Sequence, residues 1–234
     1  MKQRIWELDA FRGLCILGMV IVHLAYDIVV TTGVSMPAFF RFLLNWGGIA
    51  FIVLSGICVT LGSRSIRRGC TVLACGLLIS AVTVAMYRIG LAGKGILICF
   101  GVLHCLGTCM ILWPLLKKLN TSMQLFLGIL IIFAGLYLDK HSLADHPYLL
   151  IFGVTFPGFI TSDYFPLLPN LGYFLLGAVT GRTIYRKKES LFPDVDLHNP
   201  VLRFLTACGR YSLPIYLIHQ PVITGLMYLF TLLT

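Results

Sequence analysis

Two ionisable residues, His23 and Asp27, lie inside the otherwise apolar stretch 14–30. An ionisable side chain at mid-depth in a lipid-spanning helix costs roughly 2.5 to 3.5 kcal/mol on insertion scales, so such residues usually face a bundle interior and have a use. Residues four apart are neighbours on a helix, and the Asp27 carboxylate is expected to hold the His23 imidazole in one tautomer and to stabilise its protonated form. This pairing is typical of general-base or nucleophilic catalysis. The alternative is an intramembrane salt bridge that only fixes helix packing.

A polar stripe is predicted along this first helix. At 100° per residue, four side chains project within about 60° of one another: Asp9, Arg12, His23 and Asp27. His23 follows Leu14 by nine residues, which places it roughly 14 Å into the membrane, near the midplane. The stripe therefore runs from the cytoplasmic end of the helix to its outer half.

Two further histidines, His104 and His219, lie at comparable depth in other apolar stretches. Helical spacing places Thr108 on the face of His104 and Tyr216 on the face of His219. Three histidines at similar depth indicate one buried polar site with catalytic roles. For His104 the alternative is an interhelical hydrogen bond. For His219 it is stabilisation of a kink at Pro221, because a proline inside a span leaves a backbone carbonyl without its usual partner.

The composition predicts an all-α, polytopic membrane bundle. The chain is 58% hydrophobic and 12% charged, with a mean hydropathy of +0.91, whereas soluble domains carry about 25% charged residues. A bilayer core needs about 20 helical residues per span, and this window gives seven spans, at 14–31, 46–61, 70–87, 95–116, 123–138, 167–183 and 212–232. We expect one transmembrane domain over residues 1–234, multi-pass in the cell (plasma) membrane.

The 18 lysine and arginine residues are divided unevenly between the connections. Fourteen lie in the amino-terminal tail and in alternate connections: Lys2, Arg4, Arg12, Arg64, Arg67, Arg68, Lys117, Lys118, Arg182, Arg186, Lys187, Lys188, Arg203 and Arg210. The other four are Arg41, Arg88, Lys94 and Lys140. Because basic residues accumulate on the cytoplasmic side, the amino terminus is predicted inside and the carboxyl terminus outside. Basic loops beside anionic lipid headgroups account for the net charge of +9. We therefore expect membrane lipids, and not nucleic acid, as partners.

Several familiar site types are not expected. All eight cysteines lie in or at the ends of helical segments, where Cys behaves as a small hydrophobe, so neither disulfides nor a metal site is predicted. Glu7 and Asp9 precede the first apolar stretch and no small-residue cleavage pattern follows it, which favours a retained helix over a signal peptide.

Two connections are longer than the rest. The cytoplasmic connection, 182–210, is turn-rich and is expected to be solvated and to cover the inner face of the bundle. The outer connection, 139–165, contains an apolar run that is too short to span and is broken at Pro157-Gly158. It is interpreted as a re-entrant or interfacial segment that forms a lid over an outer vestibule.

At these residues the chain resembles the heparan-alpha-glucosaminide N-acetyltransferase catalytic-domain family and its bacterial relatives, part of a wider group of transmembrane acyltransferases. The matching segments cover most of the predicted spans in order: LDAFRGLCILGMVIVH, FIVLSGICVTLGSR, GVLHCLGT, LGYFLLGAVTGR and GRYSLPIYLIHQP. Family members move an acyl group, typically acetyl, from cytosolic coenzyme A to an acceptor sugar across the membrane.

The resemblance implies that His23 belongs to the reaction centre and that Asp9-Arg12-Gly13 shapes its cytoplasmic entrance. The animal enzymes have asparagine at the position of His23 and Gln-Arg at the position of His104-Cys105, with further spans and a luminal domain. The identity of the acceptor therefore does not follow from the resemblance.

Together these arguments predict a membrane acyltransferase that uses acyl-CoA as co-substrate and needs no metal. Arg64, Arg67 and Arg68 are expected to hold the coenzyme A phosphates, with Asp9 and Arg12 also on the donor side. His23, oriented by Asp27, would deprotonate a small-molecule or glycan acceptor, such as an amino sugar, or would form an acyl-histidine. The rival interpretation is a small-molecule or proton-coupled transporter, since His/Asp pairs at mid-depth also serve proton relays. The sequence does not determine the length of the acyl chain. It is also compatible with a homo-oligomer.

Overall fold

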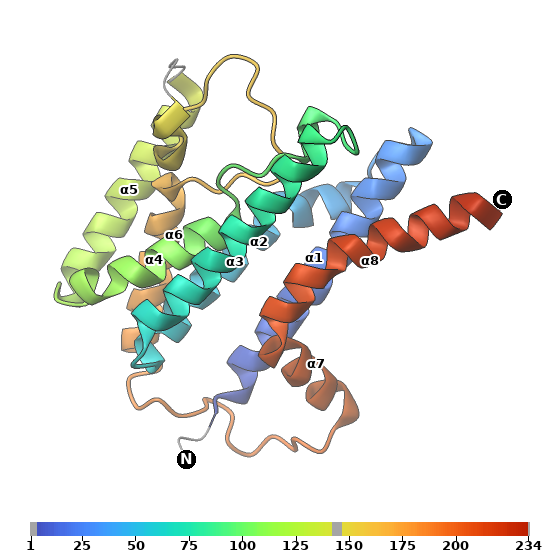
Figure 1. Ribbon diagram of the computed structural model, residues 1–234. Helices are drawn as coiled ribbons and strands as arrows, with labels where there is room; N and C mark the ends of the chain where they lie inside the picture. The colour runs from blue at the N-terminus through green and yellow to red at the C-terminus, as the bar shows by residue number, and fades with distance from the viewer. Residues whose placement is uncertain (1–3, 142–146, 234) are drawn as a thin grey trace. The chain divides into compact units, whose positions relative to one another are not determined.

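The computed structural model describes residues 4–141 and 147–233, and these are mostly helical (Figure 1). The α-helices of the described ranges are α1 Trp6–Thr32, α2 Ala38–Leu61, α3 Ser65–Arg88, α4 Val102–Leu116, α5 Thr121–His141, α6 Leu167–Thr183, α7 Pro200–Arg210 and α8 Ser212–Leu233. Two short 3₁₀ helices, η1 Lys94–Ile96 and η2 Pro147–Phe152, lie in connections. The predicted all-α fold class is confirmed.

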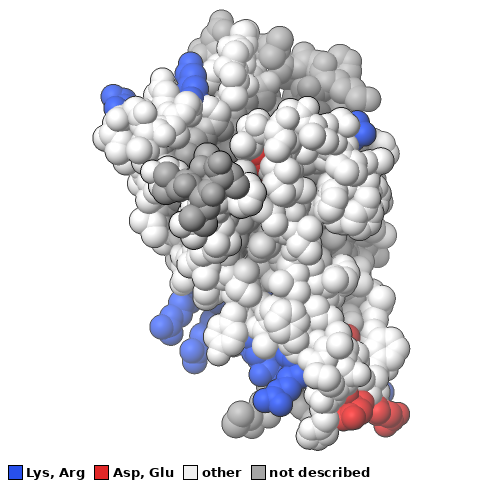
Figure 2. Space-filling view, turned by 90° about the vertical axis from the view of Figure 1, so that its right-hand side faces the viewer, with Lys and Arg blue, Asp and Glu red and all other residues white. Residues whose placement is uncertain are grey.

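Five of these helices, α1, α2, α3, α5 and α8, are long and apolar enough to cross a membrane. Most of the surface in Figure 2 is formed by uncharged side chains, and large apolar side chains such as Phe126 and Phe133 of α5 are exposed, as lipid contact requires. The chain is therefore a multi-pass membrane protein. With 15 residues in α4 and 17 in α6, these two helices fall short of the roughly 20 residues of a full span, so the predicted count of seven is not confirmed.

The predicted helix boundaries are correct for some spans and wrong for others. The sixth predicted span coincides with α6 at both ends. In contrast, α1 and α2 each begin eight residues before the predicted span. Glu7, Asp9 and Arg12 in α1, and Arg41 and Asn45 in α2, lower the hydropathy of those first turns without preventing helix formation. Hydropathy therefore finds the apolar part of a helix and misses its polar extension.

The described helices pack as two compact units, Met1–Phe51 with Lys187–Thr234, and Ile52–Arg186. The boundary falls inside α2. The assignment of residues 1–234 to one domain stays a prediction.

The first unit contains α1, α7 and α8. Both α7 and α8 pack against α1, and Figure 1 shows α8 running along α1, with α7 at the amino-terminal part of α1. The connection 182–210, which was predicted to be turn-rich and solvated, ends in the helix α7. Two local signals explain the helix: the Asn199 side chain caps it by accepting from the backbone N–H of Val201 (2.9 Å), and Pro200 occupies its first turn.

The second unit pairs α3 with α4 and α5 with α6, and α4 also touches α6. Its α2 segment packs closely on α6 at one glycine of each helix, Gly56 of α2 against the Phe174 carbonyl and Gly177 of α6 against the Val53 carbonyl. The Arg182 guanidinium donates to the carbonyl groups of Leu119 (2.8 Å) and Lys117 (3.0 Å). The carboxyl-terminal ends of α4 and α6 therefore meet.

The end of the connection 139–165 is joined to the segment before α4. Backbone bonds run from Ser162 to the Leu97 carbonyl (3.2 Å) and from Phe165 to the Phe100 carbonyl (2.9 Å). The predicted break at Pro157-Gly158 is a tight turn in which Gly158 has φ +77°, a conformation that favours glycine. These bonds anchor the end of the connection, and its role as a lid stays a prediction.

Candidate active site

Two glycines seat α7 on the start of α1. A Cβ atom at Gly13 would meet the Leu205 carbonyl oxygen, and one at Gly209 would meet the Asp9 carbonyl oxygen. Small residues at facing positions let two helix backbones approach this closely. Gly13, the last residue of the pattern Asp9-Arg12-Gly13, therefore has a packing role. Its close contact with α7 determines where the α7 side chains lie relative to α1.

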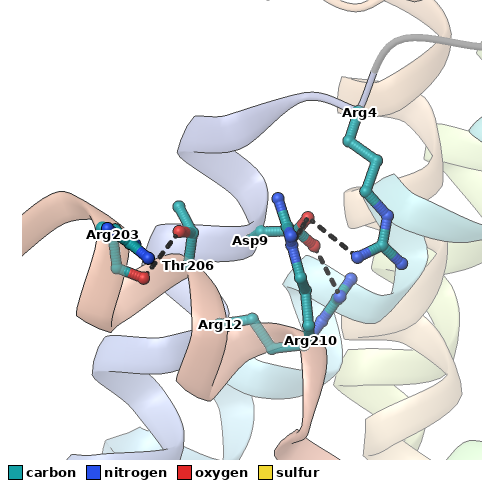
Figure 3. Close-up of polar contacts among 6 residues, drawn as sticks. All are labelled: Arg4, Asp9, Arg12, Arg203, Thr206 and Arg210. Carbon is teal, nitrogen blue, oxygen red and sulfur yellow. Dashed lines mark hydrogen bonds and ion pairs between the residues drawn. The ribbon is translucent and has the colours of Figure 1, made fainter. Parts of the chain in front are cut away.

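Three guanidinium groups converge on the buried Asp9 carboxylate (Figure 3). Arg12 donates to Asp9 Oδ1 at 3.1 Å, while Arg4 and Arg210 approach Oδ2 at 3.6 and 3.9 Å. We call Arg4, Asp9, Arg12 and Arg210 the Asp9 cluster. Arg203 and Thr206, also drawn, bond to each other within α7, the Thr206 hydroxyl donating to the Arg203 carbonyl at 3.0 Å. Asp9 and Arg12 were predicted together on the donor side, and the fold adds Arg4 and Arg210 to them.

Further along α1, His23 and Asp27 contact α8. The His23 and His219 rings meet edge to face, with centroids 4.9 Å apart and planes at 87°. Asp27 Oδ2 accepts a hydrogen bond of 2.8 Å from the Gln220 side-chain amide. We call His23, Asp27, His219 and Gln220 the α1–α8 polar group. The predicted stripe on α1 thus meets α7 at Asp9 and α8 at His23 and Asp27.

The expected orienting bond between Asp27 and His23 is not formed among the described residues. Side chains four apart on a helix have Cβ atoms about 5–6 Å apart, and a short aspartate closes that gap only when both rotamers turn toward each other. Here the carboxylate turns to α8, where the Gln220 amide supplies a donor. The prediction that Asp27 orients the His23 ring through a direct bond is corrected accordingly.

His219 has a defined tautomer. Its Nδ1 lies 2.6 Å from the Tyr216 carbonyl oxygen, which only accepts, so Nδ1 carries the hydrogen. Nε2 then presents a lone pair, and this atom is buried without a hydrogen-bond partner among the described residues. Gln220 Oε1, on the next residue, is likewise buried and unpartnered within the described part of the chain. Buried polar atoms are usually bonded, so two unpartnered acceptors on consecutive residues of one helix indicate a place for a donor group.

His104 lies in the other compact unit, with both ring nitrogens occupied. The Gly101 backbone N–H donates to Nδ1 (3.2 Å), so the neutral ring carries its hydrogen on Nε2, which faces the Ser80 hydroxyl oxygen at 3.2 Å. The Ser80 hydroxyl donates in turn to the Ile98 carbonyl (2.6 Å). This chain of bonds favours the interhelical hydrogen bond that the sequence left open. A single site holding all three histidines stays a prediction.

The predicted phosphate-binding arginines lie in the second unit and are exposed: Arg64 directly precedes α3, and Arg67 and Arg68 lie in its first turns. Their role stays a prediction. Cys105 and Cys109 are buried free thiols, and the described residues contain no group of three or more His, Cys, Asp or Glu side chains that could hold a metal ion.

The family model for the heparan-alpha-glucosaminide N-acetyltransferase catalytic domain matches residues 4–221. The chain belongs to this family. It is therefore a membrane transferase of the acetyltransferase class. The matched range includes both the Asp9 cluster and the α1–α8 polar group. No curated protein and no solved structure matches the chain significantly.

Sequence reasoning missed three residues that the fold brings to these positions, namely Arg4, Arg210 and Gln220. A signal for Gln220 was present, because it is a polar residue inside an apolar stretch, as His23 is. Arg4 and Arg210 had no local signal beyond their charge. Arg4 approaches the Asp9 carboxylate from the segment just before α1, and the packing of α7 on α1 brings Arg210 to the same carboxylate.

Proposed function

We propose that this protein transfers an acetyl group from cytosolic acetyl-CoA to an amine or hydroxyl acceptor, with an amino sugar as the first candidate, at or across the plasma membrane. One observation carries the proposal. His219 Nε2 and Gln220 Oε1, on consecutive residues of α8, are buried hydrogen-bond acceptors without donors among the described residues, and their side chains contact His23 and Asp27. An amine or hydroxyl supplies the missing N–H or O–H.

The proposed step uses His219 as general base. Its Nδ1–H is held by the Tyr216 carbonyl, which directs the Nε2 lone pair away from α8's own backbone and leaves it for the acceptor. The acceptor nitrogen or oxygen attacks the thioester carbonyl and gives its proton to Nε2. The C–S bond then breaks, and the proton passes from Nε2 to the departing thiolate, so the products are acetylated acceptor and coenzyme A.

Asp27 acts through Gln220 in this scheme. The Asp27 carboxylate accepts a hydrogen bond from the Gln220 amide NH₂ group. This bond fixes the orientation of the amide and leaves Gln220 Oε1 as an acceptor. His23 packs edge to face against His219 and keeps the place in the reaction centre that the family resemblance implies. A two-step route through an acetyl-histidine on His23 is the alternative mechanism.

His104 is proposed as a positioning residue. Its bonds join α3, the segment before α4 and the first turn of α4, so it orders the connection that also anchors the end of the outer segment. Neither ring nitrogen is left to accept a proton from a substrate.

The deciding experiment uses purified protein in nanodiscs with acetyl-CoA labelled in the acetyl group. Hydrolysis, self-acetylation and transfer to amino sugars are measured separately. Transfer supports the proposal, and self-acetylation lost in His23→Ala alone supports the two-step route. Absence of coenzyme A binding and of all three reactions would refute the proposal and favour the transporter.

Variants then test the roles of the two imidazoles. His219→Ala should lower turnover by roughly 10²- to 10⁴-fold, the usual contribution of a general base, with donor binding retained. His198→Ala is the matched control, because His198 is an exposed histidine of the same unit and its loss should leave turnover unchanged. Normal turnover in well-folded His219→Ala would exclude His219 as the base.

A further inference from the structure

The Asp9 cluster has more positive charge than its one carboxylate neutralises. Arg12 occupies Asp9 Oδ1 at hydrogen-bonding distance, whereas Arg4 and Arg210 share Oδ2 at the longer distances of 3.6 and 3.9 Å. A structural ion pair for Asp9 needs only one of these groups. Three guanidinium groups around a single carboxylate repel one another, and a bound anion would relieve that repulsion.

Arg4 and Arg210 are the two members open to a ligand. Their side chains are 61% and 52% exposed, while that of Asp9 is 10% exposed. Each guanidinium has five N–H donors in a planar fork that suits phosphate oxygens. The amino-terminal end of α1 lies beside them and has no side-chain cap.

The cluster also lies at a suitable place along α1. Asp9 and His23 are 14 residues apart on one helix, which corresponds to about 21 Å at 1.5 Å per residue. A donor with phosphates at one end and a thioester at the other end of a long pantetheine arm would span such a distance.

From these observations we infer that Arg4 and Arg210, held in place by Asp9, bind the phosphate groups of the coenzyme A donor. The inference rests on the proposed acetyl-CoA reaction and locates the donor phosphates at the α1–α7 junction, and not at Arg64, Arg67 and Arg68 at the start of α3. Asp9 is a positioning residue here. The same chemistry would recognise the phosphate of a lipid headgroup, and the test separates the two sources.

Calorimetry on the full chain in phosphatidylcholine nanodiscs measures binding of coenzyme A, 3′-dephospho-coenzyme A and pantetheine. The Arg4→Gln/Arg210→Gln double variant should bind coenzyme A roughly 10- to 100-fold more weakly than the wild type, with a weaker dependence on salt. Pantetheine has no phosphate, so both proteins should bind it equally. Arg203→Gln is the matched control, an exposed arginine on α7, and should bind coenzyme A normally.

Unchanged coenzyme A affinity in the double variant would overturn the inference, and a loss in the Arg64→Gln/Arg67→Gln/Arg68→Gln variant would then assign the phosphates to α3. If the double variant binds coenzyme A normally but loses thermal stabilisation by added phosphatidylglycerol, the cluster is a lipid-headgroup site. The Arg4→Lys/Arg210→Lys variant is the control for misfolding. It keeps both charges, so it should recover part of the affinity for coenzyme A.

Failure of the reaction itself is distinguishable. It would appear as absence of acetyl transfer by the wild-type protein. Failure of this inference alone would leave wild-type transfer intact, with the same KM for acetyl-CoA in Arg4→Gln/Arg210→Gln.

Discussion

Gly13→Ala should loosen the contact between α7 and α1. The added methyl group would meet the Leu205 carbonyl oxygen and would lie 3.1 Å from the Gly209 backbone nitrogen. Both neighbours are backbone atoms, so no side-chain rotation makes room and the helices must separate. Overpacking of this kind typically costs about 1–3 kcal/mol, which corresponds to a fall in melting temperature of roughly 2–12 °C.

Thermal melting in detergent checks this, with Gly18→Ala as the control on the same helix. A methyl group on Gly18 would have no neighbour within 4 Å outside its own stretch of helix, and alanine favours a helix over glycine by up to about 1 kcal/mol. The control should therefore melt at the wild-type temperature or slightly above it. Gly209→Ala should behave like Gly13→Ala, and the double variant should lose less than the sum, because one separation relieves both clashes. Equal melting temperatures for Gly13→Ala and Gly18→Ala would refute the close-packing argument.

Three further outcomes are expected. Ser80→Ala should destabilise the protein by roughly 1–3 kcal/mol in thermal melting, because it leaves the His104 Nε2–H without its acceptor; unchanged stability would contradict the proposed positioning role. Asp27→Asn and Gln220→Leu should each lower turnover. The double variant should be little worse than either, since the two side chains form one hydrogen-bonded pair. Additive losses of turnover would show that the two side chains act independently. Reporter fusions should place the amino terminus inside and the carboxyl terminus outside, and both termini on one side would refute the orientation taken from the basic residues.

The sequence alone determined the fold class and most of the helices. Apolar stretches long enough to span a bilayer must be helical, because lipid offers no partners for backbone N–H and C=O groups, and α6 was found with both of its ends correct. Helical periodicity also sufficed to predict that Asp9, His23 and Asp27 lie on one face of α1, because the angle between residues on one helix does not depend on the rest of the fold.

Tertiary structure decided which partner each polar side chain takes. Asp27 was expected to bond His23 on its own helix, and it bonds Gln220 on α8. His23 and His104 look alike in the sequence, yet one contacts His219 and the other closes a local network with Ser80. A hydrogen bond needs a donor and an acceptor at a short distance and a suitable angle, and when the two lie on different helices only the packing of those helices brings them together.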